Sequence, residues 1–163
     1  MNGGCFLLDS NVLITAYRSY YAFDIAPNFW VKIEEAAANG EWCFIDRVAK
    51  EITSREDELA RWLKDKYQGS ILDSGDARIT STYSDLIDHY KSESFYRESA
   101  LAEFASCADS WLIAHGIANN SIIVSLEKLQ KTDKRVKIPN ICEDNGVACI
   151  NTFEFLRQLK IKV

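Results

Sequence analysis

Short uninterrupted apolar runs alternate along the chain with longer stretches in which apolar residues recur every three or four positions. Short runs fit strands buried on both faces, and the longer period fits helices that pack by one face. Periodicity alone does not separate a short buried strand from a piece of buried helix. The pattern predicts an α/β protein with parallel strands, and the runs expected to form strands are 5–8, 41–45, 121–125 and 147–150.

Helices are expected wherever the apolar spacing is helical and capping or stop residues bound the segment. Pro27 can open one helix, and Asn39-Gly40 is a typical stop for it. Gly116 is expected to stop another, while residues 69–75 contain turn formers and predict a loop. The expected helical segments are 12–20, 27–38, 46–52, 53–66, 79–90, 99–115, 139–144 and 152–159.

The composition narrows the class of protein. A length of 163 residues with 47% hydrophobic residues predicts one folded domain, residues 1–163, with a substantial core. Five scattered cysteines without a Cys-x-x-Cys pair indicate reduced thiols, and two histidines are too few for a histidine-rich metal site. With no apolar run of membrane-spanning length, the protein is expected to be soluble and cytoplasmic.

Four acidic residues stand where a carboxylate is unusual. Asp9 and Glu127 each come directly after an expected strand, and open α/β sheets bind ligands at the carboxyl ends of their strands. Asp109 falls in the apolar row of its helix, and Glu51 on or beside the apolar row of another. Three of the four have a structural alternative: Asp9 as a helix cap, Asp109 bonded to a backbone amide, and Glu51 as a solvated side chain.

If these carboxylates converge at one edge of the sheet, they require a counterion. Two bare charges about 4 Å apart repel by about 4 kcal/mol at an effective dielectric constant of about 20. All-oxygen ligands select a hard cation, so we expect Mg²⁺ or Mn²⁺ at a site that hydrolyses phosphodiesters. The net charge of −5 leaves no global basic surface, but one local basic segment follows Glu127. Its candidate phosphate-binding residues, which could equally be a solvated surface, are Lys128, Lys131, Lys134 and Arg135.

Three motifs resemble those of PIN domains, the ribonuclease fold of VapC-type toxins. The first is Asp9-Ser10-Asn11, the second carries Glu51 on a helix, and the third is Asp109-Ser110-Trp111-Leu112-Ile113-Ala114. The resemblance implies a three-layer α/β/α fold with a central, mainly parallel sheet and metal-dependent endoribonuclease activity. It implies that Asp9, Glu51 and Asp109 ligate the metal.

At the family's fourth acidic position the chain departs from the pattern. Ser125-Leu126-Glu127 stands where the family has Thr-x-Asp, and glutamate is one methylene longer than aspartate. By the resemblance, Glu127 would complete the catalytic and metal-binding set. Ser125 would support Asp9, and Asn11 would support the local turn.

The resemblance also implies partners, namely an RNA substrate and a cognate antitoxin that silences the toxin, and a second copy of the chain is a further candidate. The aromatic segment Tyr17–Phe23 could serve such a surface or pack into the core. A second reading is a PIN-like module that binds RNA or protein with little catalysis. A third, a phosphoacceptor receiver domain, would need paired acids after the first strand, where only Asp9 stands.

Overall fold

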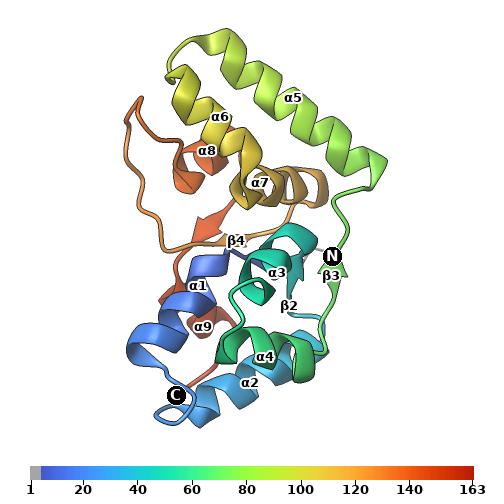
Figure 1. The fold of residues 1–163 in the computed structure, drawn as a ribbon, viewed down its shortest axis with the longest axis vertical. Coiled ribbons are helices and arrows are strands. Elements are labelled where there is room, and N and C mark those ends of the chain that lie inside the picture. Colours follow the sequence, from blue (N-terminus) through green and yellow to red (C-terminus); the bar gives the residue numbers. More distant parts are fainter. Residues whose placement is uncertain (1–4) are drawn as a thin grey trace.

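The computed structural model describes residues 5–163 (Figure 1) and contains one five-stranded sheet with the strand order β3-β2-β1-β4-β5. All four strand pairings are parallel. This confirms the expected α/β class with a central parallel sheet, and it places every strand's carboxyl end at the same edge. The strands are β1 (Phe6–Leu8), β2 (Trp42–Ile45), β3 (Ile71–Leu72), β4 (Ile123–Val124) and β5 (Cys149–Ile150).

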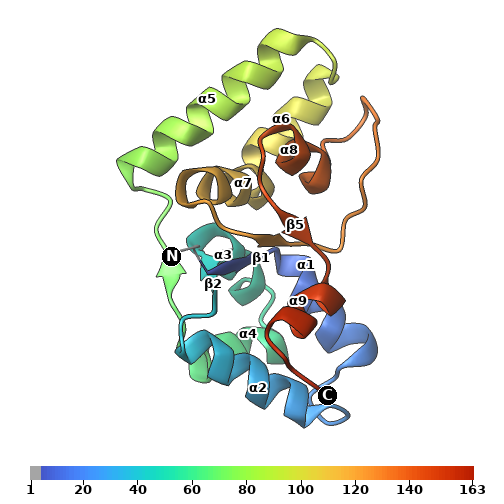
Figure 2. The same ribbon diagram turned by 180° about the vertical axis from the view of Figure 1, so that it is seen from behind.

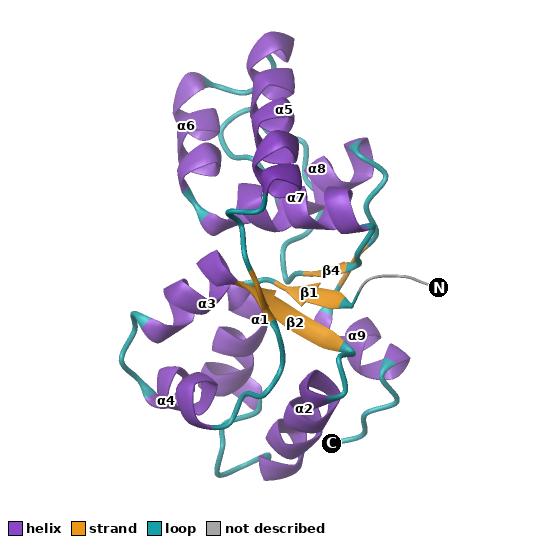
Figure 3. Cartoon of the chain, turned by 90° about the vertical axis from the view of Figure 1, so that its right-hand side faces the viewer, coloured by secondary structure: helices purple, strands orange, loops and turns teal. Residues whose placement is uncertain are grey.

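Helices form two layers, one on each side of the sheet. Figure 3 shows α5 to α8 gathered on one side, and α1 to α4 with α9 on the other. No helix within residues 5–163 is both long and apolar enough to span a lipid bilayer. The helices are α1 (Ser10–Thr15), the π-helix η1 (Ala16–Tyr20), α2 (Pro27–Ala38), α3 (Asp46–Thr53), α4 (Glu58–Asp65), α5 (Ala77–Glu93), α6 (Glu98–Ser106), α7 (Ala108–Asn119), α8 (Ile138–Asp144) and α9 (Thr152–Gln158).

The helix expected over 99–115 is two helices, so that prediction was wrong. Cys107 has extended backbone angles (φ −104°, ψ 172°) and separates α6 from α7. Gly116 does not stop α7, which continues to Asn119 and ends at Asn120 in the left-handed conformation. Gly116 instead allows close packing on the sheet, because a Cβ there would lie 2.9 Å from Ile123 Cδ1.

Two further boundaries differ from the expectation. The segment 53–66 is not one helix, because α3 ends at Thr53 and Asp57 starts α4 by accepting a hydrogen bond from the Ala60 amide at 3.0 Å. The expected loop 69–75 contains β3, which pairs with β2. With only two residues and one exposed side chain, Ile71, this strand has too little apolar pattern to be recognised.

Aromatic side chains form the part of the core that packs against α2. Tyr21 packs on Phe29 with ring centroids 4.6 Å apart, and Phe23 stacks on Trp30 at 4.3 Å. Tyr17 also packs against this core, so core packing is the use that the structure shows for most of the 17–23 segment. At the opposite end of the chain, β5 leads into α9, which Figure 2 shows beside α1 and near the C-terminus.

A buried polar network joins the carboxyl ends of β2 and β3 to α7. The Ser74 hydroxyl lies 2.6 Å from Asp46 Oδ1 and 2.9 Å from His115 Nε2, and the Ser74 amide donates to Asp46 Oδ2 at 3.0 Å. Since the carboxylate can only accept, the Ser74 proton goes to Asp46 and His115 Nε2 carries its own proton. Burial lowers the pKa of His115. This Ser74 network ties α7 to the sheet edge.

We predict that Ser74→Ala destabilises the protein by about 1–3 kcal/mol, because it leaves buried His115 without a hydrogen-bond partner among the described residues. Urea unfolding measures the change. The matched control is Ser84→Ala at an exposed position of α5, which should change the free energy of unfolding by less than about 0.5 kcal/mol. Equal stabilities of the two variants would contradict this role of Ser74.

Candidate functional site at the carboxyl edge of the sheet

Asp9 lies directly after β1 and is 3% exposed. Its backbone holds the strand end, because its amide donates to Val124 O at 3.0 Å and its carbonyl accepts from the Val12 amide at 3.1 Å. The side chain makes no capping hydrogen bond to α1, so helix capping does not explain this buried acid. Ser125 Oγ donates to Asp9 Oδ2 at 3.3 Å, which is the contact that the family resemblance implies.

The three other predicted acids lie near enough to Asp9 to act on its charge. Burial, followed in order of size by repulsion from Asp109, Glu127 and Glu51, raises the pKa of Asp9 from 3.8 to about 8. Asp9 and Glu127 follow β1 and β4, and Glu51 and Asp109 lie on α3 and α7. The four acids are therefore neighbours at the carboxyl edge of the sheet, and this group is here called the acidic site.

Asp109 owes its position to the break at Cys107. The break places it in the first turn of α7, where the helix dipole favours a negative charge, instead of in the middle of one long helix. Burial and repulsion from Glu127 and Glu51 raise its pKa to about 6, while Arg135 acts in the opposite direction. The Cys107 thiol beside it has its pKa raised to about 11 by burial and by Asp109.

Glu51 is the exposed member of the acidic site. It lies on α3 and lines a surface hollow of about 300 Å³ together with Cys107 and Ala108. Two cations of α3, Arg47 and Lys50, line the same hollow. Neither residue was among the sites predicted from the sequence, although Arg47 and Lys50 stand four residues and one residue before Glu51 on the same helix.

Glu127 is already engaged by the protein. Its Oε1 accepts from the Ile138 amide at 2.9 Å, its Oε2 from Arg135 Nη2 at 3.3 Å, and its amide donates to Ser125 Oγ at 3.1 Å. It therefore fixes the start of α8 and the basic segment while it faces Asp9. Metal binding by Glu127 stays a prediction, as does the turn role of Asn11, which is exposed on α1.

The donor set suits a hard divalent cation. Asp9, Glu51 and Asp109 offer only carboxylate oxygens, and their mutual repulsion is relieved by positive charge. Residues 5–163 contain no three His, Cys, Asp or Glu side chains drawn close enough for a ready-made metal cage. The acids therefore suit an ion that keeps several water ligands when bound, as Mg²⁺ commonly does.

The basic segment does not converge on the acids as a whole. Arg135 reaches them through Glu127, but Lys131 lies over the Phe95 ring at 4.5 Å, in the turn between α5 and α6. Arg97 Nε pairs with Asp133 at 3.2 Å and fastens the segment to the same turn. Lys128 and Lys134 are exposed. Their predicted RNA contacts stay predictions.

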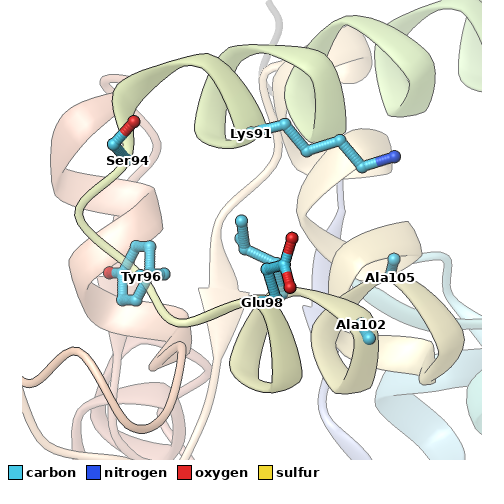
Figure 4. A pocket seen from close by; sticks show the side chains of 7 residues that line it. Lys91, Ser94, Tyr96, Glu98, Ala102 and Ala105 are labelled. Carbon is cyan, nitrogen blue, oxygen red and sulfur yellow. The ribbon is translucent and has the colours of Figure 1, made fainter.

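A larger cavity of about 660 Å³ lies between α5 and α6. Figure 4 shows Lys91 of α5 above Glu98 of α6, with Ala102 and Ala105 farther along α6 at the right of the view. None of the predicted site residues lines it. The cavity is therefore separate from the acidic site, which remains the candidate functional site because it contains the buried acid Asp9.

Comparisons with known proteins agree with this architecture. A family model described as a domain of unknown function, DUF4411, matches residues 6–163. No curated protein sequence matches the chain significantly.

Two solved structures share the fold at low sequence identity. VapBC2 from Rickettsia felis, bound to a DNA fragment from its promoter, superposes with a TM-score of 0.57 at 14% identity, covering 90% of this chain and 98% of the other. FitAcB from Neisseria gonorrhoeae gives a TM-score of 0.59 at 14% identity, covering 91% and 98%. These likenesses confirm the fold that the motifs indicate, a VapC-like PIN-domain fold.

The raised pKa of Asp9 makes a prediction about the metal-free protein. Its folded-state pKa of about 8 exceeds the ordinary 3.8, so the acid's contribution to stability is present below about pH 4 and is lost as pH rises toward 8. Asparagine has no proton to release, so the Asp9→Asn variant acquires no charge at this position as the pH rises. In EDTA it should match the original protein near pH 4 and be more stable by on the order of 5 kcal/mol at pH 8, because each pH unit between the two pKa values is worth about 1.4 kcal/mol.

Thermal unfolding between pH 4 and 8 measures this difference. Asp24→Asn is the matched control, since Asp24 is exposed in the loop before α2 and its variant should follow the original protein at every pH. A difference between Asp9→Asn and the original protein that does not grow with pH would contradict a carboxylate held in this environment.

Proposed function

We propose, from the premise that the chain belongs to the DUF4411 family and has a VapC-like PIN-domain fold, that it is a divalent-metal-dependent endoribonuclease. The observation that carries the proposal is the convergence of Asp109, Glu51 and Glu127 on buried Asp9. Burying a carboxylate among like charges costs several kcal/mol, and a fold that needed only a core would place an apolar residue there.

Asp9, Glu51 and Asp109 would hold the ion, directly or through water. A bound Mg²⁺ or Mn²⁺ would neutralise the acids, draw a backbone phosphate to the site and activate water for phosphodiester hydrolysis. Ser125 keeps Asp9 oriented through its hydrogen bond. Arg135, which is linked to Glu127 and acts to lower the pKa of Asp109, would contact a phosphate at the edge of the site.

Substitution of the two innermost acids tests the activity. We expect the original protein to cleave single-stranded RNA in Mn²⁺ or Mg²⁺ and to stop in EDTA. Asp9→Asn and Asp109→Asn should each lower the cleavage rate by at least about 100-fold, because each removes a charge that holds the ion. Cleavage of a labelled RNA is read on a gel, and circular dichroism checks that the variants are folded.

Asp24→Asn serves again as the control and should keep full activity. Cleavage that persists in EDTA, or that Asp9→Asn and Asp109→Asn retain, would contradict the proposal. Glu127→Gln separates a structural role of Glu127 from metal binding, because the amide oxygen can still accept from the Ile138 amide. A fall in the cleavage rate below about tenfold indicates a structural role. A fall like that of Asp109→Asn indicates that Glu127 is a metal ligand.

A second candidate is a PIN-like module that binds RNA or protein without efficient catalysis. The observation in its favour is that both Glu127 oxygens are bonded within the protein, so the fourth acid is not free. RNA binding that needs no metal and gives no cleavage would support this module over the nuclease.

The nuclease would be the toxin of a toxin–antitoxin pair. The support is the shared fold of the VapBC2 and FitAcB structures, which are both complexes of two named components. Co-expression with the product of an adjacent small gene should yield a stable complex in which RNA cleavage falls at least about tenfold. Size-exclusion chromatography and the cleavage assay measure this, and full activity of the isolated complex would contradict an inhibitory partner.

A further inference from the structure

Arg47 lies beside the acidic site in an arrangement that the proposed chemistry has not used. It is the second residue of α3, and its guanidinium carbon lies 4.2 Å from the centroid of the Trp111 ring. Trp111 follows Asp109 by two residues on α7. The same Arg47 lines the 300 Å³ hollow that contains Glu51 and Cys107. A fixed cation thus stands at the border of the carboxylates.

The absence of an ion pair at Arg47 is informative. Arg47 and Glu51 are four residues apart on one helix, the spacing at which opposite charges ordinarily pair. Within residues 5–163, however, Arg47 takes part in none of the ion pairs, and its guanidinium lies over Trp111 instead. The aromatic ring occupies the guanidinium's face, so the N–H donors in its plane are left available for another group.

The indole under Arg47 is itself supported from behind. Tyr83 of α5 stacks on Trp111 with ring centroids 3.8 Å apart and an angle of 5° between the planes. The Tyr83 hydroxyl donates to Ala105 O at 2.6 Å, which fixes the tyrosine against α6. Three helices therefore hold one surface arginine in place, and a guanidinium that is preorganised in this way loses little entropy when it binds an anion.

Lys50 adds a second cation to the same hollow, one helical turn after Arg47. By contrast, Lys131 of the basic segment is directed onto Phe95, at the turn between α5 and α6. Both cations that line the hollow with Glu51 are therefore on α3.

We propose that Arg47 and Lys50 bind a backbone phosphate of single-stranded RNA, so that the strand crosses the hollow between α3 and the α6–α7 break on its way to the acidic site. The inference rests on the proposed ribonuclease function and names the surface by which the substrate is held. Arg47, supported by Trp111 and Tyr83, would set the position of the strand, and Lys50 would add charge.

Binding of a fluorescein-labelled single-stranded RNA of about 12 nucleotides, followed by anisotropy, tests the inference. The protein is the full chain with Asp109→Asn in Mg²⁺, so that the RNA stays intact. Arg47→Gln should weaken binding roughly tenfold, the usual effect of one charged hydrogen bond. It should also reduce the slope of log Kd against log salt by about 0.7, the value for one phosphate contact on a single strand.

Two further variants separate phosphate binding from packing. Arg47→Lys keeps the charge but lacks the planar fork, so it should keep the salt slope and lose only part of the affinity. Arg18→Gln is the control, because Arg18 is exposed on η1 and its loss should change neither quantity. An Arg47→Gln protein with the affinity and salt slope of Arg18→Gln would overturn the inference.

The outcomes for the binding surface and for the nuclease are distinct. Metal-dependent cleavage by the original protein without any effect of Arg47 would refute the surface and leave the nuclease. Arg47-dependent RNA binding without cleavage would refute the nuclease and leave the surface. The absence of any RNA binding, in all variants and in the original protein, would refute both.

Discussion

The burial of Asp9 among three other carboxylates is the constraint on which the acidic site depends. A carboxylate that leaves water loses its solvation, and here the only neighbour within the described residues that is found to favour its charged form is the Ser125 hydroxyl. The rest of the surroundings opposes that charge. The backbone cannot relieve the conflict by moving, because the Asp9 amide and carbonyl are both bonded at the end of β1. The backbone of Asp9 is thus held in place, and the free energy of the site depends strongly on whether Asp9 carries a proton.

The helix α7 is held against the same edge of the sheet by several contacts along its length. Its first turn carries Asp109 over the strand ends, and its later turns carry His115 into the Ser74 network at the ends of β2 and β3. The close approach at Gly116 seats the same helix against β4. Because three separate contacts fix one short helix, the relative position of Asp109 and Asp9 depends on residues that lie well away from either acid.

The sequence predicted the parts of the fold that carry a strong local pattern. Apolar runs located β1 and β2, Pro27 and Asn39-Gly40 bounded α2, and the acids after β1 and β4 were placed by the rule that parallel strands end at one edge. The break at Cys107 was not predicted because the apolar row of 99–115 continues through it in sequence, and no local residue pattern marks Cys107 as extended.

Tertiary contacts explain the other differences. β3 exists because β2 offers it a partner, and Ser74 is buried because Asp46 and His115 meet it from other elements. The stacking of Arg47, Trp111 and Tyr83 likewise joins three helices that are distant in sequence. A single sequence shows which residues carry charge, but it does not show which of them already have a partner. For this reason the basic residues after Glu127 were expected to act together, whereas Arg135 pairs with Glu127 and Lys131 lies over Phe95.

Both edge strands of the sheet are very short. β3 and β5 contribute two residues each, so an incoming chain that aligned with either would find only one or two free backbone groups. Association by extending the sheet, whether with a partner or in an aggregate, gains little on this molecule. Proteins that bind it must therefore recognise helix surfaces and the side chains on them, where selectivity is set by shape and charge and less by backbone pairing.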